Sequence, residues 1–141
     1  MSCYITIVAK SANFGFPETD VGLTITTAGT KLLAQIVGLG KAKELVFTGD
    51  VIDSHEALTI GLVNKVVAAE SLLEESTVMA RRIGEKSPLA LKLSRIAIDQ
   101  GLHSSFEQTL EMEAGHLLIC AGAQNQQKFV ERKLEKMKGN I

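Results

Sequence analysis

The residues most able to do chemistry lie between positions 14 and 30. Glu18 follows a proline in a turn between an expected strand and an expected helix. Its apolar neighbours in sequence are Phe14, Phe16 and Val21. An apolar setting disfavours the charged form of a carboxyl group and suits it to proton transfer. Glu18 is therefore a candidate general acid or base, and the alternative is an exposed loop carboxylate, the commoner state of an acidic side chain.

Other reactive residue types favour structural roles. His55, His103 and His116 are not expected to bind a metal, and no metal site is predicted. Cys3 and Cys120 lie far apart and form no C-x-x-C pair, so we expect small core residues in a reduced, cytoplasmic compartment. The segment 24–30 is rich in threonine and precedes a helix, but it lacks the lysine of a phosphate-binding P-loop.

Length and composition limit the class of protein. The chain has 141 residues, of which 45% are hydrophobic, and this suits one ordinary globular domain with a core. Fifteen basic against 16 acidic residues give a net charge of −1, and the basic residues form no single stripe, so nucleic-acid binding is not expected. The apolar stretches are too short for a membrane-spanning helix.

The elements that must position Glu18 lie in the first half of the chain. Alternating and β-branched residues predict strands over residues 4–9 and 64–67. Apolar spacing and glycines predict short helices, and Asp53 with Glu56 forms a capping-box pattern closed by a glycine. These short helices are expected over residues 27–37, 42–47 and 54–60.

The second half of the chain is expected to be helical. Ser87 before Pro88 predicts a helix start, and Ser104 with Glu107 forms a second capping-box pattern. Phe106, Leu110, Leu117 and Ala121 are expected to share one face of the helix that follows. The helices are expected over residues 70–86, 88–101, 105–121 and 124–138. The apolar faces exceed what so small a cluster can bury, which favours self-association.

Five segments in this order resemble the enoyl-CoA hydratase/isomerase (crotonase) superfamily, and the resemblance extends from Cys3 to about Lys133. The segments are Phe14-Gly15-x-Pro17-Glu18-x-x-Val21-Gly22, Ala28-Gly29-Thr30, Leu45-Val46-Phe47-Thr48-Gly49-Asp50, Glu56-Ala57-Leu58-x-x-Gly61-Leu62-Val63-Asn64-Lys65-Val66-Val67 and Lys86-Ser87-Pro88-Leu89-Ala90.

The resemblance implies an α/β fold. It indicates the C-terminal part of the crotonase spiral, mostly helical, with residues 1–69 in the spiral core and residues 70–141 in a helical trimerisation region. Members are about twice as long, and the matched segments indicate their C-terminal half. Two backbone N–H groups that bind the thioester oxygen belong to upstream loops, as does the first of two catalytic glutamates. Glu18 matches the second, which handles the proton at the α-carbon.

Some positions depart from the family pattern. Thr26 stands where the family has a glycine whose N–H helps to hold the catalytic water. Ile25 replaces a proline and Ala28 replaces the first glycine of Gly-Gly-Thr, which implies a bulkier wall of the acyl pocket. Phe129 and Arg132 resemble the aromatic and the cation that approach coenzyme A from a neighbouring subunit, although a solvated helix face explains Arg132 equally well.

The resemblance implies an enzyme of fatty-acid or related acyl-CoA metabolism, a cytoplasmic homo-oligomer with three or six copies. Hydration of a 2-enoyl-CoA is the first expectation and double-bond isomerisation the second. Coenzyme A is part of the substrate, and no separate cofactor is expected. The competing hypothesis is a catalytically inactive oligomerisation or binding module left from a truncated or split gene.

Overall fold

The computed structural model describes residues 4–26 and 28–138. The chain divides into two compact units, Met1–Val78 and Met79–Ile141, and the boundary falls within the sequence of helix α4 (Leu72–Gly84). The division predicted from the sequence, between residues 69 and 70, lies just before this helix and stays a prediction. Cys3 lies outside the described residues, and so does Thr27.

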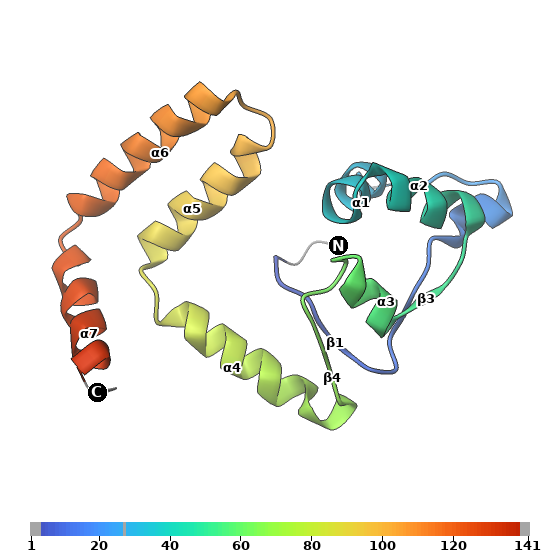
Figure 1. Cartoon of the computed structure of the whole chain (residues 1–141), viewed down its shortest axis with the longest axis horizontal. Helices are drawn as coiled ribbons and strands as arrows, with labels where there is room; N and C mark the ends of the chain where they lie inside the picture. The colour runs from blue at the N-terminus through green and yellow to red at the C-terminus, as the bar shows by residue number, and fades with distance from the viewer. Residues whose placement is uncertain (1–3, 27, 139–141) are drawn as a thin grey trace. The chain divides into compact units, whose positions relative to one another are not determined.

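The first unit contains the two strands that the sequence predicts, each shorter than expected. Strand β1 (Ile7–Ala9) pairs in parallel with strand β4 (Lys65–Val67), and Val8 lies opposite Val66 (Figure 1). Their β-branched residues suit a pleated, half-buried surface. The Asn64 side chain accepts a hydrogen bond from the Thr6 N–H at 2.7 Å, and the Asn64 N–H donates to the Thr6 carbonyl at 2.8 Å.

A second strand pair has no counterpart in the sequence-based prediction. Strand β2 (Asn13–Phe14) pairs in antiparallel fashion with strand β3 (Ile52–Asp53), and Phe14 lies opposite Ile52. Each strand has only two residues, which is too short for a period of two to be visible in sequence. The pair matters for the site because Phe14 begins the segment that leads to Glu18.

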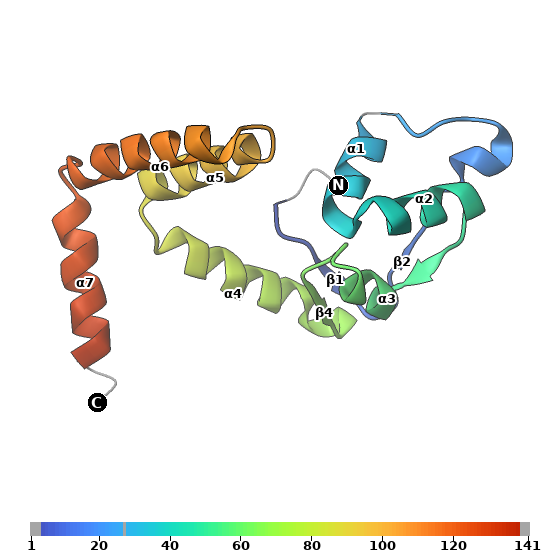
Figure 2. The same cartoon turned by 45° about the horizontal axis from the view of Figure 1, so that its top comes forward.

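Short helices supply the core of this unit. They are α1 (Gly29–Val37), α2 (Leu39–Thr48) and α3 (Ser54–Thr59), with one-turn 3-10 helices η1 (Pro17–Val21) and η2 (Ala69–Ser71). Helix α1 packs against α2 (Figures 1 and 2). The core consists of buried apolar side chains from these helices, strand β3 and the segment before β4: Leu33, Ala42, Leu45, Ile52, Ala57 and Val63.

The capping box predicted at the start of α3 is confirmed for the Asp53 side chain. The Asp53 carboxylate accepts from the N–H groups of His55 and Glu56, at 2.9 and 2.8 Å. The carboxylate of Glu56 lies 2.8 Å from Lys41 Nζ on α2, so this ion pair links the first turn of α3 to α2. Gly61, just beyond the helix, has φ +78°, the left-handed conformation that the sequence pattern requires.

The second unit is helical, as predicted. It holds the end of α4, followed by α5 (Pro88–Gly101), α6 (Phe106–Ala121) and α7 (Gln126–Lys138). Helices α5 and α6 pack side by side as an antiparallel hairpin (Figures 1 and 2). Ser87 caps α5 by accepting from the Ala90 N–H at 3.3 Å, which confirms the predicted start.

The predicted cap of α6 is shifted by one residue. Ser105, not Ser104, is the N-cap, and its hydroxyl accepts from the Gln108 N–H at 3.2 Å while the Gln108 side chain accepts from the Ser105 N–H at 3.0 Å. Ser104 with Glu107 and Ser105 with Gln108 both fit the capping-box pattern. The Ser104 hydroxyl instead donates to the Gln100 carbonyl at the end of α5.

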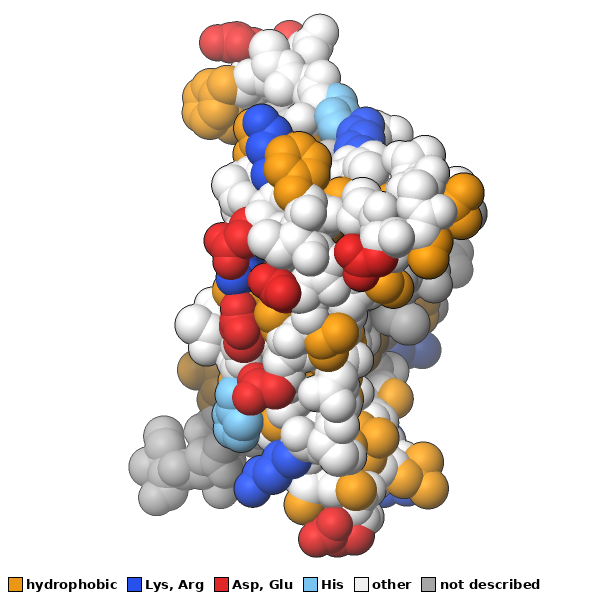
Figure 3. Space-filling model, turned by 90° about the vertical axis from the view of Figure 1, so that its right-hand side faces the viewer, with side chains coloured by type: hydrophobic (Ala, Val, Ile, Leu, Met, Phe, Trp, Pro, Cys, Tyr) orange, Lys and Arg blue, Asp and Glu red, His pale blue; other side chains and the backbone are white. Residues whose placement is uncertain are grey.

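The apolar face predicted for α6 is open to solvent in this chain. Phe106 is 74% exposed and Leu117 is 69% exposed. The half-buried side chains of α6 lie on another face and include Met112 and His116. Figure 3 shows that hydrophobic side chains also reach the surface elsewhere, among charged side chains. None of the described helices is long and apolar enough to cross a membrane.

Candidate active site

Glu18 lies in the one-turn helix η1, directly after Phe16. Both Phe14 and Phe16 pack against the core of the first unit, and this packing fixes the chain that enters the turn. The Glu18 carbonyl accepts from the Leu23 N–H at 2.8 Å, which closes the turn. Val21, by contrast, is 70% exposed. The apolar surroundings of this turn therefore come from Phe14 and Phe16.

One carboxylate oxygen of Glu18 is shielded from solvent and unpaired. Oε2 is buried and has no hydrogen-bond partner among the described residues. Removing a carboxylate oxygen from water without giving it a donor costs free energy, and such groups are often found where a substrate or water completes the site. The geometry therefore differs from the exposed loop carboxylate that was the alternative, and the catalytic role stays a prediction.

The second part of the site is the segment that enters helix α1. Ile25 is half-buried, and its Cγ2 lies 2.5 Å from the position that a Cβ on Gly29 would occupy. A side chain at position 29 would therefore collide with Ile25. Thr26 is exposed, and its carbonyl accepts from the Gly29 N–H at 3.0 Å. Both residues lie in the same unit as Glu18.

Ala28 has a strained backbone. It is the residue before α1 and has φ +58°, the single positive value at a non-glycine position among the described residues. Left-handed backbone brings the Cβ of an L-residue close to the following carbonyl. The structure thus gives a physical reason for the glycine that the family pattern has at this position.

The strain at Ala28 can be measured. We expect Ala28→Gly to raise the free energy of unfolding by about 0.5–1 kcal/mol, because relief of the left-handed strain exceeds the entropy that glycine adds to the unfolded chain. The matched control is Ala34→Gly inside α1, which lowers stability by about 1 kcal/mol. Urea titration of both variants checks this, and a loss of stability in both would contradict the assignment of strain.

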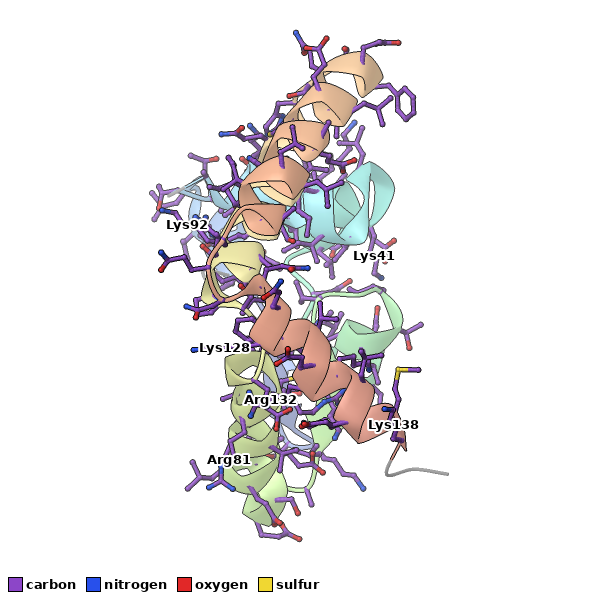
Figure 4. The ribbon with its side chains drawn as sticks, turned by 90° about the vertical axis from the view of Figure 1, so that its left-hand side faces the viewer. Lys41, Arg81, Lys92, Lys128, Arg132 and Lys138 are labelled. Carbon is purple, nitrogen blue, oxygen red and sulfur yellow. The ribbon has the colours of Figure 1, made fainter. Side chains whose placement is uncertain are left out.

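Phe129 and Arg132 lie in the second unit and line one hollow. This hollow has a volume of about 830 Å³ and is bordered by the start of α5, the loop after α6 and helix α7. Phe129 is half-buried, while Arg132 is exposed and extends from α7 together with Lys128 (Figure 4). The full lining is Ser87, Pro88, Leu89, Ala90, Cys120, Ala123, Gln124, Asn125, Gln126, Lys128, Phe129, Val130, Arg132, Lys133 and Leu134.

An ion pair fixes α7 beside this hollow. Lys136 Nζ lies 2.8 Å from the Glu85 carboxylate, which follows α4. The hydrogen bond and charge of Lys136 lower the pKa of Glu85 below its ordinary value of 4.5, and the charge of Arg132 contributes in the same direction. The positive charge of Arg132, which borders the hollow, therefore also acts on the Glu85 carboxylate.

The pairing of Glu85 predicts a pH dependence. Because its pKa is lower in the folded chain, the pair stabilises the fold above about pH 4.5, and this contribution is lost as the pH falls through the lowered pKa. We expect Glu85→Gln to melt at a slightly lower temperature than the wild type at pH 7, with a smaller difference at pH 3 because the Glu85 carboxylate becomes increasingly protonated as the pH falls. An equal difference at both pH values would contradict the pairing. Glu113→Gln on α6 is the control.

A second hollow was missed by the sequence reasoning. It has a volume of about 500 Å³, lies between α5 and α6, and is lined by His116 and Cys120 among others. These two residues are four positions apart and therefore share a helix face, a signal that the sequence contains. His116 Nδ1 is buried without a hydrogen-bond partner in the part of the chain that the structure describes. Over the same residues, no three side chains form a metal-binding group.

The predicted site residues fall into two groups. Glu18, Ile25 and Thr26 belong to the first unit, and Phe129 and Arg132 belong to the second. Phe129 and Arg132 line the same hollow, while Ile25 and Thr26 lie between η1 and α1 in the sequence. Their joint role in one site stays a prediction.

Comparison with known proteins gives the class. The family model for enoyl-CoA hydratase/isomerase matches residues 1–140, and the chain belongs to this family. It is 41% identical over 141 residues to a crotonyl-CoA hydratase of Syntrophomonas wolfei, covering 100% of this chain and 54% of that protein. It is 38% identical over 130 residues to a short-chain-enoyl-CoA hydratase of Clostridioides difficile, covering 92% of this chain and 84% of that protein.

The fold is shared with solved structures of the same family. The crystal structure of an enoyl-CoA hydratase from Bacillus anthracis has a TM-score of 0.90 and 31% identity, covering 95% of this chain and 52% of that one. This confirms the predicted α/β, mostly helical crotonase fold. The chain spans about half the length of the first relatives it matches.

Proposed function

We propose that the protein hydrates 2-enoyl-CoA thioesters, with Glu18 as the acid/base group. The observation that carries the proposal is the buried, unpaired Oε2 of Glu18 in a turn anchored on the core. The names of the relatives support the same substrate class, since one is a crotonyl-CoA hydratase and another a short-chain-enoyl-CoA hydratase.

The proposed chemistry adds water across the double bond next to the thioester. Oxygen of water bonds to the β-carbon, the double-bond electrons move toward the thioester, and a proton is delivered to the α-carbon. Glu18 supplies that proton and regains one from the water as its oxygen bonds to the β-carbon, so the carboxyl group ends the reaction as it began it. The negative charge that develops on the thioester oxygen needs hydrogen-bond donors. We propose that these donors come from polypeptide outside residues 1–141, and the activity tests below use the protein together with that polypeptide.

The remaining site residues are assigned to binding. Ile25 and Thr26 are assigned to the wall of the acyl pocket near helix α1, where the Ile25 side chain lies against Gly29. Phe129 and Arg132 bind the coenzyme A part of the substrate, Arg132 by pairing with a phosphate group. Their position on one hollow supports this assignment. No separate cofactor is part of the proposal.

The proposal includes self-association into three or six copies. Exposed apolar side chains on α5 and α6, such as Ile98, Leu110 and Leu118, support it because monomers rarely expose so much apolar surface. Sedimentation equilibrium measures the mass directly. A cytoplasmic location and a place in fatty-acid metabolism complete the proposal.

The test is turnover of crotonyl-CoA by the purified protein. Hydration removes the conjugated thioester, so its ultraviolet absorbance falls with time. Incubation with a 3-enoyl-CoA is the parallel experiment for isomerisation, since that reaction makes the absorbance rise. A steady fall with crotonyl-CoA supports hydration. No change with either substrate contradicts the proposed activity and favours an inactive binding module.

A further inference from the structure

We propose that Thr19 is a positioning residue, whose hydroxyl fixes the Glu18 turn against the end of helix α2. This inference rests on the proposed function of Glu18. The Thr19 Oγ1 donates to the Val46 carbonyl at 2.8 Å. The two residues are 27 positions apart, so the hydrogen bond joins separate elements rather than closing a local turn.

The acceptor, the Val46 carbonyl, has no backbone donor within its own helix. Val46 lies in the last turn of α2, which ends at Thr48, and the final carbonyls of a helix have no intrahelical partner. The Asp50 N–H, the group that a longer helix would offer to Val46, lies 3.2 Å from the Thr48 hydroxyl instead. The Thr19 hydroxyl therefore takes the place of a backbone donor. Val46 also packs against the core, so the anchor point is fixed.

A second contact lies on the other side of the same turn. The carboxylate of Asp20 rests on Gly49, where a Cβ would stand 2.8 Å from both carboxylate oxygens. Gly49 also has φ +69° and closes α2 through its N–H, which donates to the Leu45 carbonyl at 3.2 Å. The two residues after Glu18 thus both touch the end of α2, and Glu18 is held from one side by this helix.

The hydrogen bond is exposed, which defines its expected effect. Its net contribution to global stability is small because water competes for both groups. Its contribution to position is larger, since a displacement of about 1 Å at a reacting group can cost up to about 10²-fold in rate. Loss of the Thr19 hydroxyl should therefore change kcat and local opening more than it changes melting.

The test compares Thr19→Val, which keeps the shape but removes the hydroxyl, with Thr19→Ser, which keeps the donor. Thr59→Val is the matched control, because Thr59 Oγ1 donates to the His55 carbonyl at 2.9 Å in α3, away from this turn. The first readout is kcat and KM for crotonyl-CoA. The second is hydrogen exchange of the Leu23 amide, which donates to the Glu18 carbonyl and reports opening of the turn.

For Thr19→Val we expect kcat to fall about tenfold, KM to change less than about twofold, and Leu23 exchange to speed up about tenfold. Thr19→Ser and Thr59→Val should match the wild type in all three. Unchanged exchange in Thr19→Val overturns the anchor, and faster exchange with unchanged kcat in an active wild type overturns its role in positioning Glu18. If the wild type shows no turnover while exchange responds as expected, the anchor stands and the proposed function fails.

Discussion

Glu18→Gln is expected to lower kcat for crotonyl-CoA hydration by about 10²–10⁴-fold, the range that a positioned acid or base contributes. Glutamine keeps the size and shape of the side chain but cannot supply a proton to the α-carbon. The η1 turn itself should persist, because the closing hydrogen bond uses the backbone carbonyl of Glu18 and not its side chain. KM should therefore change far less than kcat.

The control for this variant is Glu70→Gln. Glu70 is an exposed glutamate in the one-turn helix η2 of the same unit, so the substitution makes the same chemical change away from η1. Its kcat should equal that of the wild type. Because Oε2 of Glu18 is buried and unpaired, Glu18→Gln should leave the melting temperature unchanged or raise it. Full turnover by Glu18→Gln would contradict the role assigned to Glu18.

Leu33→Ala is expected to lower the free energy of unfolding by about 3 kcal/mol, the typical cost of truncating a fully buried leucine. Leu33 is 0% exposed and belongs to the core cluster of the first unit, together with Leu45 and Ala57. The loss combines apolar transfer with the cavity that remains. Because this core supports both α1 and the segment that enters η1, the variant should also lose activity at temperatures where the wild type keeps it.

Leu32→Ala is the matched control for the core. Leu32 is the preceding residue of the same helix and is 38% exposed, so the same truncation should cost about 1 kcal/mol or less. Urea titration followed by circular dichroism measures both. Equal destabilisation by the two substitutions would mean that α1 does not present Leu33 to the core as the structure describes.

Sequence reasoning predicted the elements whose signals are local. The strands that became β1 and β4, and the caps at Asp53 and Ser87, depend on residues a few positions apart. The cap of α6 was placed one residue early because Ser104 and Ser105 both fit the pattern, and only tertiary structure decides between them. The two-residue pair β2–β3 carries no periodicity and could not be predicted.

The candidate site shows the same division. Glu18 could be chosen from its apolar neighbours and the family resemblance, but the burial of Oε2 is a property of the folded chain. The Thr19 anchor depends on α2, which lies far along the chain. The strain at Ala28 likewise lies in its backbone conformation, which cannot be predicted from an alanine side chain. The apolar residues of α6 agree with the expectation that the helical faces exceed what the chain can bury, since Phe106 is 74% exposed.

The most direct test of the central claim is the mass of the product formed from crotonyl-CoA in D₂O. If the protein adds water with Glu18 as the proton donor, the wild type makes 3-hydroxybutyryl-CoA with one carbon-bound deuterium at the α-carbon. Early in the reaction, Glu18→Gln makes about 10²–10⁴-fold less of it in the same time at the same protein concentration. Equal amounts of labelled product from both proteins, or no product from the wild type, would contradict the account.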